Sequence, residues 1–210
     1  MAKISAVFNK INLLRERYYK ASMGKDALIK LISEAEIPEQ VYNSNAIENN
    51  TLTLEETEKI LLQIDLDRYI TGREIFEAKN LARVVSYIDK RSKEQELTLE
   101  VILSLHKMLI SNIRDDVAGR FRKEGEYVRV GSYIAPNPKE ILERLEKMLL
   151  EYNVTNHENI IKRIARLHLA FEYIHPFIDG NGRIGRVINN YLLIREGFVP
   201  INIKFIDRKK

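Results

Sequence analysis

Apolar residues recur every three or four positions along most of this 210-residue chain. That spacing places them on one face of an α-helix. The segment 72–93 shows it most clearly, with Ile75, Ala78, Leu81, Val84, Val85 and Ile88. Similar spacing predicts helices over 9–34, 53–64, 98–109, 138–150, 158–173 and 182–197. The sequence therefore predicts a mostly helical, all-α fold.

Local signals mark several helix ends. Thr53 and Glu56 have the spacing of a capping box, in which a hydroxyl and a carboxylate satisfy the free N–H groups of a first turn. We expect the first helix to stop before Pro38 and the helix over 158–173 to end at His175-Pro176, because the residue before a proline resists helical geometry. Gly197 should end the last helix.

One segment favours β structure. The runs 127–130 and 133–135 are separated by Gly131-Ser132, and a glycine in first position suits a two-residue type II′ turn. A lone hairpin is only marginally stable, so we expect it to lie as a flap on the helical body. The predicted flap comprises Tyr127, Val128, Arg129, Val130, Gly131, Ser132, Tyr133 and Ile134.

The composition excludes several classes of protein. The chain has no cysteine, so it can hold no disulfide, thiolate metal site or cysteine nucleophile. No apolar stretch approaches the roughly 18 residues that cross a bilayer, and the first apolar run breaks at Asn9 and Lys10. We therefore expect a cytoplasmic protein without a membrane partner.

The net charge of +4 raises the question of nucleic-acid binding. The densest basic stretch, 114–130, holds five Arg and Lys residues, and it also holds four Asp and Glu residues. A surface that follows phosphates needs unopposed positive charge. Nucleic acid is therefore not the expected partner.

Residues 175–186 combine groups that bind phosphates. Gly180, Asn181 and Gly182 open a helix, and free N–H groups at a helix N-terminus attract anions. Arg183 and Arg186 lie three positions apart, so both can face an anion held there. These residues predict a cradle for nucleotide phosphates.

Two further residues complete the predicted site. Asp179 can hold a divalent cation against phosphates through oxygen ligation. His175 can accept a proton near neutral pH. The chain lacks the glycine-rich loop with Gly-Lys-Ser/Thr of P-loop enzymes. The alternative interpretation is an N-capped helix after a proline turn, with a surface histidine and two solvated arginines.

The segment 175–186 resembles the signature of the Fic family, HPFxxGNGRxxR with an acidic residue before the first glycine, at every defined position. The order of helices over 72–197 and the position of the hairpin are also similar to that family. The resemblance implies a protein adenylyltransferase, which transfers AMP from Mg-ATP to a Ser, Thr or Tyr hydroxyl of a target protein.

Roles follow from the resemblance. His175 would deprotonate the target hydroxyl, and Asp179 would bind Mg²⁺, with Mn²⁺ as an alternative ion. Gly180, Asn181 and Gly182 would surround the α- and β-phosphates, while Arg183 and Arg186 would neutralise the outer phosphates. The branch of the family that acts as a kinase has Lys in place of Gly182, so glycine favours nucleotidyl transfer.

Residues 44–50 match a second family pattern, (S/T)xxxE(G/N)N, through Ser44, Glu48 and Asn50. By itself, Asn45 with Glu48 could equally be a capping box. Upstream of a Fic signature, the pattern resembles the family's inhibitory helix. The resemblance implies that Glu48 pairs with Arg186 and leaves ATP bound with its α-phosphate misaligned for attack.

The expected partners are a target protein and a second copy of the chain. A target segment could add as a strand along the flap, where Tyr127 and Tyr133 could either clamp the target or pack the hairpin onto the body. The resemblance adds self-modification and a homodimer as expectations. Of the other histidines, His106 and His168 are expected to be structural, and His157 lies in a polar loop.

The sequence thus predicts N-terminal helices over 1–70, which include the motif 44–50, and a Fic core over 71–210, which includes the signature. Three alternative functions remain open. The chain could remove AMP from a modified target with Glu48, or transfer another nucleotide or phosphate moiety. It could also be a protein-binding module with a vestigial site.

Overall fold

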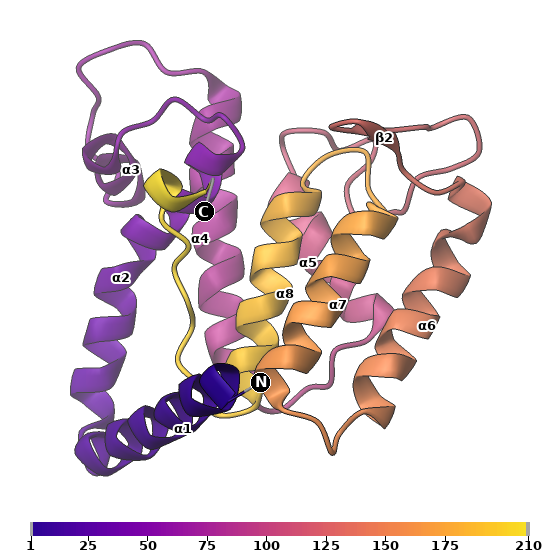
Figure 1. Ribbon diagram of the computed structural model, residues 1–210. Coiled ribbons are helices and arrows are strands. Elements are labelled where there is room, and N and C mark those ends of the chain that lie inside the picture. The colour runs from indigo at the N-terminus through magenta and orange to yellow at the C-terminus, as the bar shows by residue number, and fades with distance from the viewer. Residues whose placement is uncertain (1, 209–210) are drawn as a thin grey trace. The chain divides into compact units, whose positions relative to one another are not determined.

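The structure is a computed structural model that describes residues 2–208 (Figure 1). The chain divides into two compact units, 1–37 and 38–210. The first unit contains α1 (Ala2–Ser22) and the beginning of α2 (Asp26–Ile47). The second unit contains the rest of α2 and all the residues of the candidate site. The predicted division at residue 70 stays a prediction.

The N-terminal helices differ from the expected single helix over 9–34. Gly24 adopts a left-handed conformation, with φ of 72°, and separates α1 from α2. The expected stop before Pro38 is wrong, because Pro38 lies inside α2. A proline lacks the N–H group that would bond to the carbonyl four residues back, yet the helix continues to Ile47. Residues 44–47 of the second motif are therefore helical.

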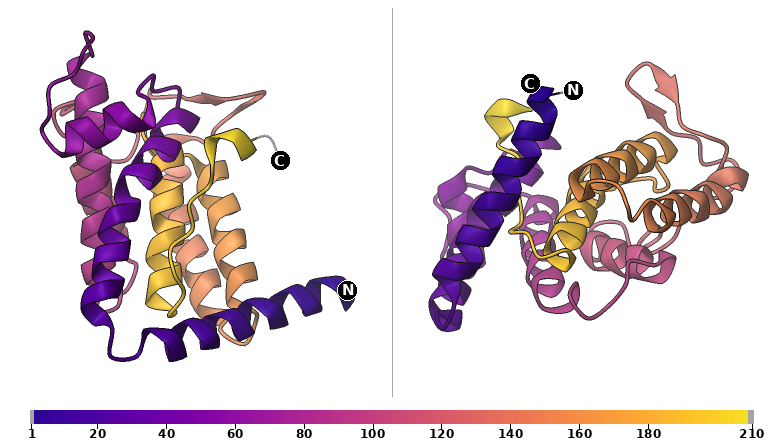
Figure 2. Two further views of the ribbon diagram at one scale, coloured as in Figure 1. Left: turned by 90° about the vertical axis from the view of Figure 1, so that its left-hand side faces the viewer. Right: turned by 60° about the horizontal axis from the view of Figure 1, so that its bottom comes forward.

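The second unit is a bundle of helices around α8 (Asn181–Arg195). α8 packs against α4 (Gly72–Arg91), α5 (Leu99–Ile110) and α7 (Ile160–Ile174), and α6 (Ile141–Val154) covers α7. α7 and α8 form an antiparallel pair joined by residues 175–180 (Figure 2). The predicted all-α fold is thus confirmed. The remaining elements are a short α3 (Leu54–Leu61) and 3-10 turns at Pro138–Glu140 and Phe205–Asp207.

Side-chain caps begin several of these helices. Thr53 and Glu56 form the predicted capping box of α3. Thr71 and Glu74 form a second box at the start of α4, and Thr98 caps α5. The end of α6 differs from the prediction, because the helix continues to Val154 instead of ending near Leu150.

The core surrounds α8, which is buried on nearly every side. Ile184, Ile188 and Tyr191 of this helix are fully buried. Leu81 of α4 and Leu105 of α5 are buried to the same extent. Because the signature begins α8, the packing of the whole core fixes its position.

The hairpin is short and partly anchored. β1 (Arg129–Val130) pairs antiparallel with β2 (Tyr133–Ile134), so Val130 lies opposite Tyr133. Gly131 has φ of 57°, as the first position of a type II′ turn requires. The Tyr133 hydroxyl donates to the Glu172 carbonyl, and its ring stacks on Tyr173. Tyr133 therefore packs the hairpin onto the body, whereas Tyr127 is exposed.

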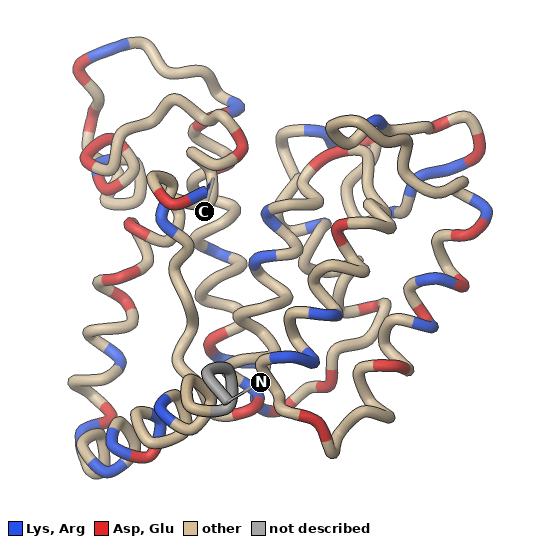
Figure 3. Tube along the Cα trace, viewed as in Figure 1, with Lys and Arg blue, Asp and Glu red and all other residues tan. Residues whose placement is uncertain are grey.

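Basic and acidic residues are interspersed along the chain (Figure 3). In the basic stretch 114–130, Arg114 pairs with Asp116 and Arg120 pairs with Glu126. Across residues 2–208, no helix is both long and apolar enough to span a bilayer.

The burial of the core gives a direct stability test. Leu105 is fully buried, while Leu169 is 69% exposed. We expect Leu105→Ala to lower the free energy of unfolding by about 2–5 kcal/mol, because it removes apolar contacts and leaves a cavity. Leu169→Ala, the matched control, should change it by less than about 0.5 kcal/mol. Chemical denaturation measures both, and equal effects would contradict this packing.

Candidate active site

The loop between α7 and α8 has an unusual backbone. His175 ends α7 in the left-handed region, with φ of 47°, and Gly180 precedes α8 with φ of 84°. A Cβ atom at position 180 would lie 2.9 Å from Ile110 of α5. Gly180 is therefore required both for its conformation and for the close packing of the loop on α5.

Asn181 closes this loop with its side chain. Its Oδ1 accepts from the backbone N–H of Phe177 at 2.9 Å, and its Nδ2 donates to the Phe177 carbonyl at 2.8 Å. Phe177 itself is fully buried. The amide of Asn181 is thus committed to loop geometry, and its backbone N–H remains part of the helix N-terminus.

His106 supports the loop from α5. Its Nδ1 accepts from the N–H of Gly119, so Nε2 carries the proton and donates to the Asp179 carbonyl at 3.0 Å. Its ring stacks on Phe177 with centroids 3.7 Å apart. Burial lowers the pKa of His106 to about 4, so it is neutral. His106 is structural, as expected, and the residues that it holds belong to the signature.

Arg122 is a buried residue that sequence reasoning missed. Its guanidinium donates to the backbone carbonyls of His175, Ile174, Glu126 and Pro136. Its backbone N–H donates to the carbonyl of Pro176. It therefore joins the signature loop to both ends of the hairpin segment. The sequence shows only an arginine within a mixed-charge run, and nothing there signals these carbonyl partners.

The surroundings of His175 favour the neutral form of its imidazole. Burial lowers its pKa, although the Glu172 carbonyl opposes the shift. Its Nδ1 is buried and has no hydrogen-bond partner among the described residues. The imidazole is therefore neutral at pH 7, and a neutral imidazole can take a proton.

The carboxylate of Asp179 is held between two arginines. Its Oδ2 lies 2.7 Å from Arg73 Nη2, and its Oδ1 lies 3.2 Å from Arg183 Nη2. Glu77 Oε1 is 3.1 Å from both Arg73 Nε and Arg183 Nη1. The four side chains thus form a ring of alternating charge. Burial opposes ionisation of Asp179, but Arg183 and Arg73 outweigh it and lower the pKa of this carboxyl group.

The ring contains Asp179, the expected ligand of Mg²⁺. One carboxylate with substrate phosphates and water is an arrangement that Mg²⁺ favours, so the chemistry of Asp179 fits this ion. No group of three or more metal-ligating side chains occurs among the described residues. Arg73 and Glu77 were not predicted as site residues, because nothing in the sequence relates α4 to the signature.

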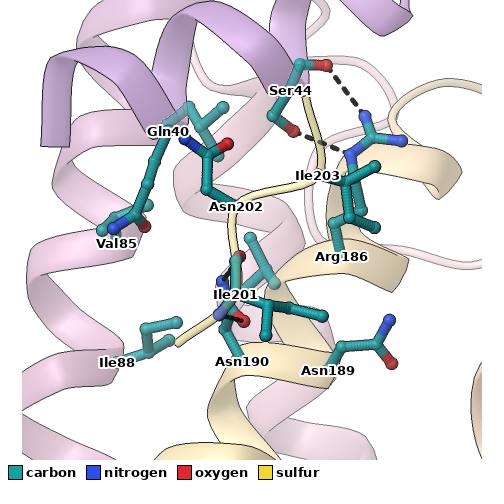
Figure 4. A pocket seen from close by; sticks show the side chains of 12 residues that line it. Gln40, Ser44, Val85, Ile88, Arg186, Asn189, Asn190, Ile201, Asn202 and Ile203 are labelled. Carbon is teal, nitrogen blue, oxygen red and sulfur yellow. Dashed lines mark hydrogen bonds between the residues drawn. The ribbon is translucent and has the colours of Figure 1, made fainter. Parts of the chain in front are cut away.

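Arg183 and Arg186 do not face the same partners. Arg183 is buried in the ring, with 2% of its side chain exposed. Arg186 reaches α2, where its Nε donates to the Ser44 hydroxyl and its Nη2 donates to the Ser44 carbonyl, both at 2.9 Å (Figure 4). Its Nη2 also donates to Glu48 Oε1 at 2.8 Å. The expected contact between Glu48 and Arg186 is therefore present.

Glu48 also lies directly against the start of α8. A Cβ atom at position 182 would be 2.3 Å from Glu48 Oε1. A larger residue at position 182 would force that carboxylate to shift from this place, and the helix N-terminus there favours a negative charge. Glu48 therefore occupies the place that the sequence assigns to a phosphate.

The second motif lies at the end of a helix instead of at a start. Residues up to Ile47 belong to α2, and Asn49 follows with φ of 67°. The capping-box interpretation of Asn45 and Glu48 is therefore wrong. Asn50 Nδ2 donates to Glu77 Oε2 at 2.8 Å, so the motif contacts both Arg186 and the charged ring.

The remaining predicted residues are spread over both ends of the bundle (Figure 1). The hairpin and the signature loop are at the same end of the bundle (Figures 1 and 2). His168 and Glu172 of α7 both face Gly185 of α8, and His157 is exposed. A small groove next to the Ser44–Arg186 contact is lined by Gln40, Asn189, Asn190, Ile201 and Asn202 among others (Figure 4).

Comparison with solved structures finds the same fold. The structure described as Fic-1, residues 134–508, from C. elegans has a TM-score of 0.84 at 26% identity, and the match covers 100% of this chain and 63% of that one. A Fic domain containing signaling protein from Bacteroides thetaiotaomicron has a TM-score of 0.83 at 24% identity over 95% of this chain and 77% of that one.

Comparison of sequences gives the same relationship. A protein of Nematostella vectensis named "Protein adenylyltransferase Fic" is 30% identical over 96% of this chain and 48% of its own length. A protein of that name in Drosophila willistoni is 30% identical over 95% of this chain and 42% of its own length. The chain thus spans about half the length of these relatives. The sequence model of the Fic/DOC family matches residues 96–193, which include the whole signature. Residues 96–193 of the chain therefore form a domain of the Fic/DOC family.

Proposed function

We propose that the chain is a protein adenylyltransferase that Glu48 holds in an inhibited state. The contact of Glu48 with Arg186 across Gly182 supports this proposal most strongly. The relatives named as protein adenylyltransferases support the reaction type. ATP is then the co-substrate and a protein hydroxyl of Ser, Thr or Tyr is the acceptor.

The reaction requires few groups beyond those at the start of α8. The acceptor oxygen attacks the α-phosphorus of ATP, and its proton passes to the neutral imidazole of His175. The bond between the α-phosphorus and the oxygen bridging to the β-phosphate breaks, and pyrophosphate leaves. N–H groups of residues 180–182 stabilise the charge on the phosphates. Mg²⁺, held by Asp179, would supply further charge neutralisation.

Inhibition follows from charge and space. Glu48 places a carboxylate against Gly182 and engages Arg186, whose side chain is 15% exposed. A triphosphate that entered would meet this negative charge and would lack a free arginine for its outer phosphate. ATP would then bind weakly, with its α-phosphate misaligned.

The other expected features join the proposal. The hairpin would receive the target as an added strand, and Arg122 would keep its base fixed relative to His175. Self-modification would occur at exposed tyrosines such as Tyr127. A homodimer, and a division into regulatory residues 1–70 and catalytic residues 71–210, are further parts of the proposal.

Transfer of label from α-³²P-ATP tests the function. With Mg²⁺ and a cell lysate, the wild-type chain should label itself and other proteins weakly. Glu48→Gly should raise labelling on the order of 10- to 100-fold, the equivalent of one strong charged hydrogen bond. Adding His175→Ala to Glu48→Gly should lower it again by roughly 10²- to 10⁴-fold, because the base is lost.

Two results would contradict the proposal. Equal labelling by wild type and Glu48→Gly would remove the inhibitory role of Glu48. Labelling that survives the loss of His175 would remove its role as base. Glu124→Gly, which removes an exposed carboxylate paired with Lys139, is the control for loss of a negative charge.

The pKa of His175 predicts a pH dependence. Its pKa lies below the ordinary value of 6.5 because of burial, and the neutral form is the active one. For Glu48→Gly, kcat/KM should therefore fall to half of its plateau value at a pH below 6.5. A midpoint above pH 6.5 would show that another group limits the reaction.

A further inference from the structure

We propose that Arg73 occupies the cation position on Asp179 in the inhibited state and must leave before a metal ion can bind. This inference rests on the proposed role of Asp179 in holding Mg²⁺. Arg73 Nη2 lies 2.7 Å from Asp179 Oδ2, which is the shorter of the two arginine contacts to this carboxylate. A guanidinium in that place neutralises the same charge that a divalent ion would neutralise.

Only one of the two arginines can move away easily. Arg183 has 2% of its side chain exposed, so water does not reach its charge and the guanidinium depends on Glu77 and Asp179 for compensation. Arg73, at the start of α4, has 51% of its side chain exposed. Water can therefore solvate its charge once it leaves. The Oδ2 atom of Asp179 is thus the one that becomes free for a metal ion.

The inhibitory motif stabilises Arg73 in this position. Arg73 Nε donates to Glu77 Oε1, and the second oxygen of Glu77 accepts from Asn50 Nδ2. Asn50 follows Glu48 by two residues, and its backbone N–H donates to the carbonyl of Asn45. Movement of the motif away from Arg186 therefore also removes a hydrogen bond that orients Glu77.

The consequence is a common control of two parts of the site. Ser44 and Glu48 hold the arginine that would bind an outer phosphate, and Asn50 acts through Glu77 and Arg73 on the carboxylate that would bind the metal. Release of one short segment thus prepares both groups together. Arg73 is a positioning residue in this account, since it need not touch the nucleotide.

Metal binding can be measured without any turnover. The affinity for ADP is determined by isothermal titration calorimetry with Mn²⁺ and again with EDTA, and the ratio of the two dissociation constants gives the contribution of the metal. We expect Arg73→Gln to increase this ratio by roughly two- to fivefold over wild type, the range of a partly exposed ion pair.

A control variant distinguishes displacement of Arg73 from Asp179 from the loss of any positive charge near Asp179. Arg114 also acts on Asp179 electrostatically, but it pairs with Asp116 and is 43% exposed, similar to Arg73. Arg114→Gln should leave the ratio close to wild type. Asn50→Ala should give part of the gain, and combined with Arg73→Gln it should add nothing, because both act through one contact network.

The outcomes distinguish the two proposals. Asp179→Asn should remove the dependence on Mn²⁺, and persistence of that dependence would overturn the proposed metal site itself. If Asp179→Asn removes the dependence but Arg73→Gln and Arg114→Gln give the same ratio, the metal site stands and the role of Arg73 is wrong. A ratio for Arg73→Gln at or below wild type would also overturn it.

Discussion

The close approach of a carboxylate to the first turn of α8 is the interaction on which the rest of this site depends. Glu48 Oε1 lies where a side chain at position 182 would begin, so Gly182 is what permits the contact. The helix N-terminus attracts the negative charge, and Arg186 binds it from the side. The same two features would bind a phosphate. In the proposed function, one anion site thus has two competing occupants, and it lies at the start of the buried helix α8.

In the described structure, the charged side chains that are expected to bind the nucleotide and its metal ion are paired with other groups of the protein. Arg186 is engaged by Ser44 and Glu48, Arg183 lies within a ring of carboxylates, and Asp179 is held by arginines. His175, in contrast, is neutral, and its buried Nδ1 has no hydrogen-bond partner among the described residues. Activation in this account is therefore an exchange of partners among charged groups and requires no change in the base.

The sequence predicted what depends on neighbouring residues. The periodic helices, the Thr53 capping box, the Gly131 turn and the spacing of residues 175–186 all involve short separations along the chain. Among contacts between distant segments, it predicted the one between Glu48 and Arg186, through the family resemblance, and missed the others described above. Arg122 reaches carbonyls more than 50 residues away, and Arg73 reaches Asp179 across 106 positions. The expected end of the helix before Pro38 was wrong, because α2 continues through this proline to Ile47.

The competition between Glu48 and the outer phosphates is the central claim, and nucleotide affinity tests it most directly. Glu48→Gln keeps the shape of the side chain and removes its charge, so calorimetric titrations of ATP and of AMP compare the two nucleotides on the same protein. The account predicts that ATP binds on the order of tenfold more tightly to Glu48→Gln than to wild type, while AMP, which lacks the outer phosphates, changes little. An equal gain for both nucleotides, or no gain for ATP, would contradict it.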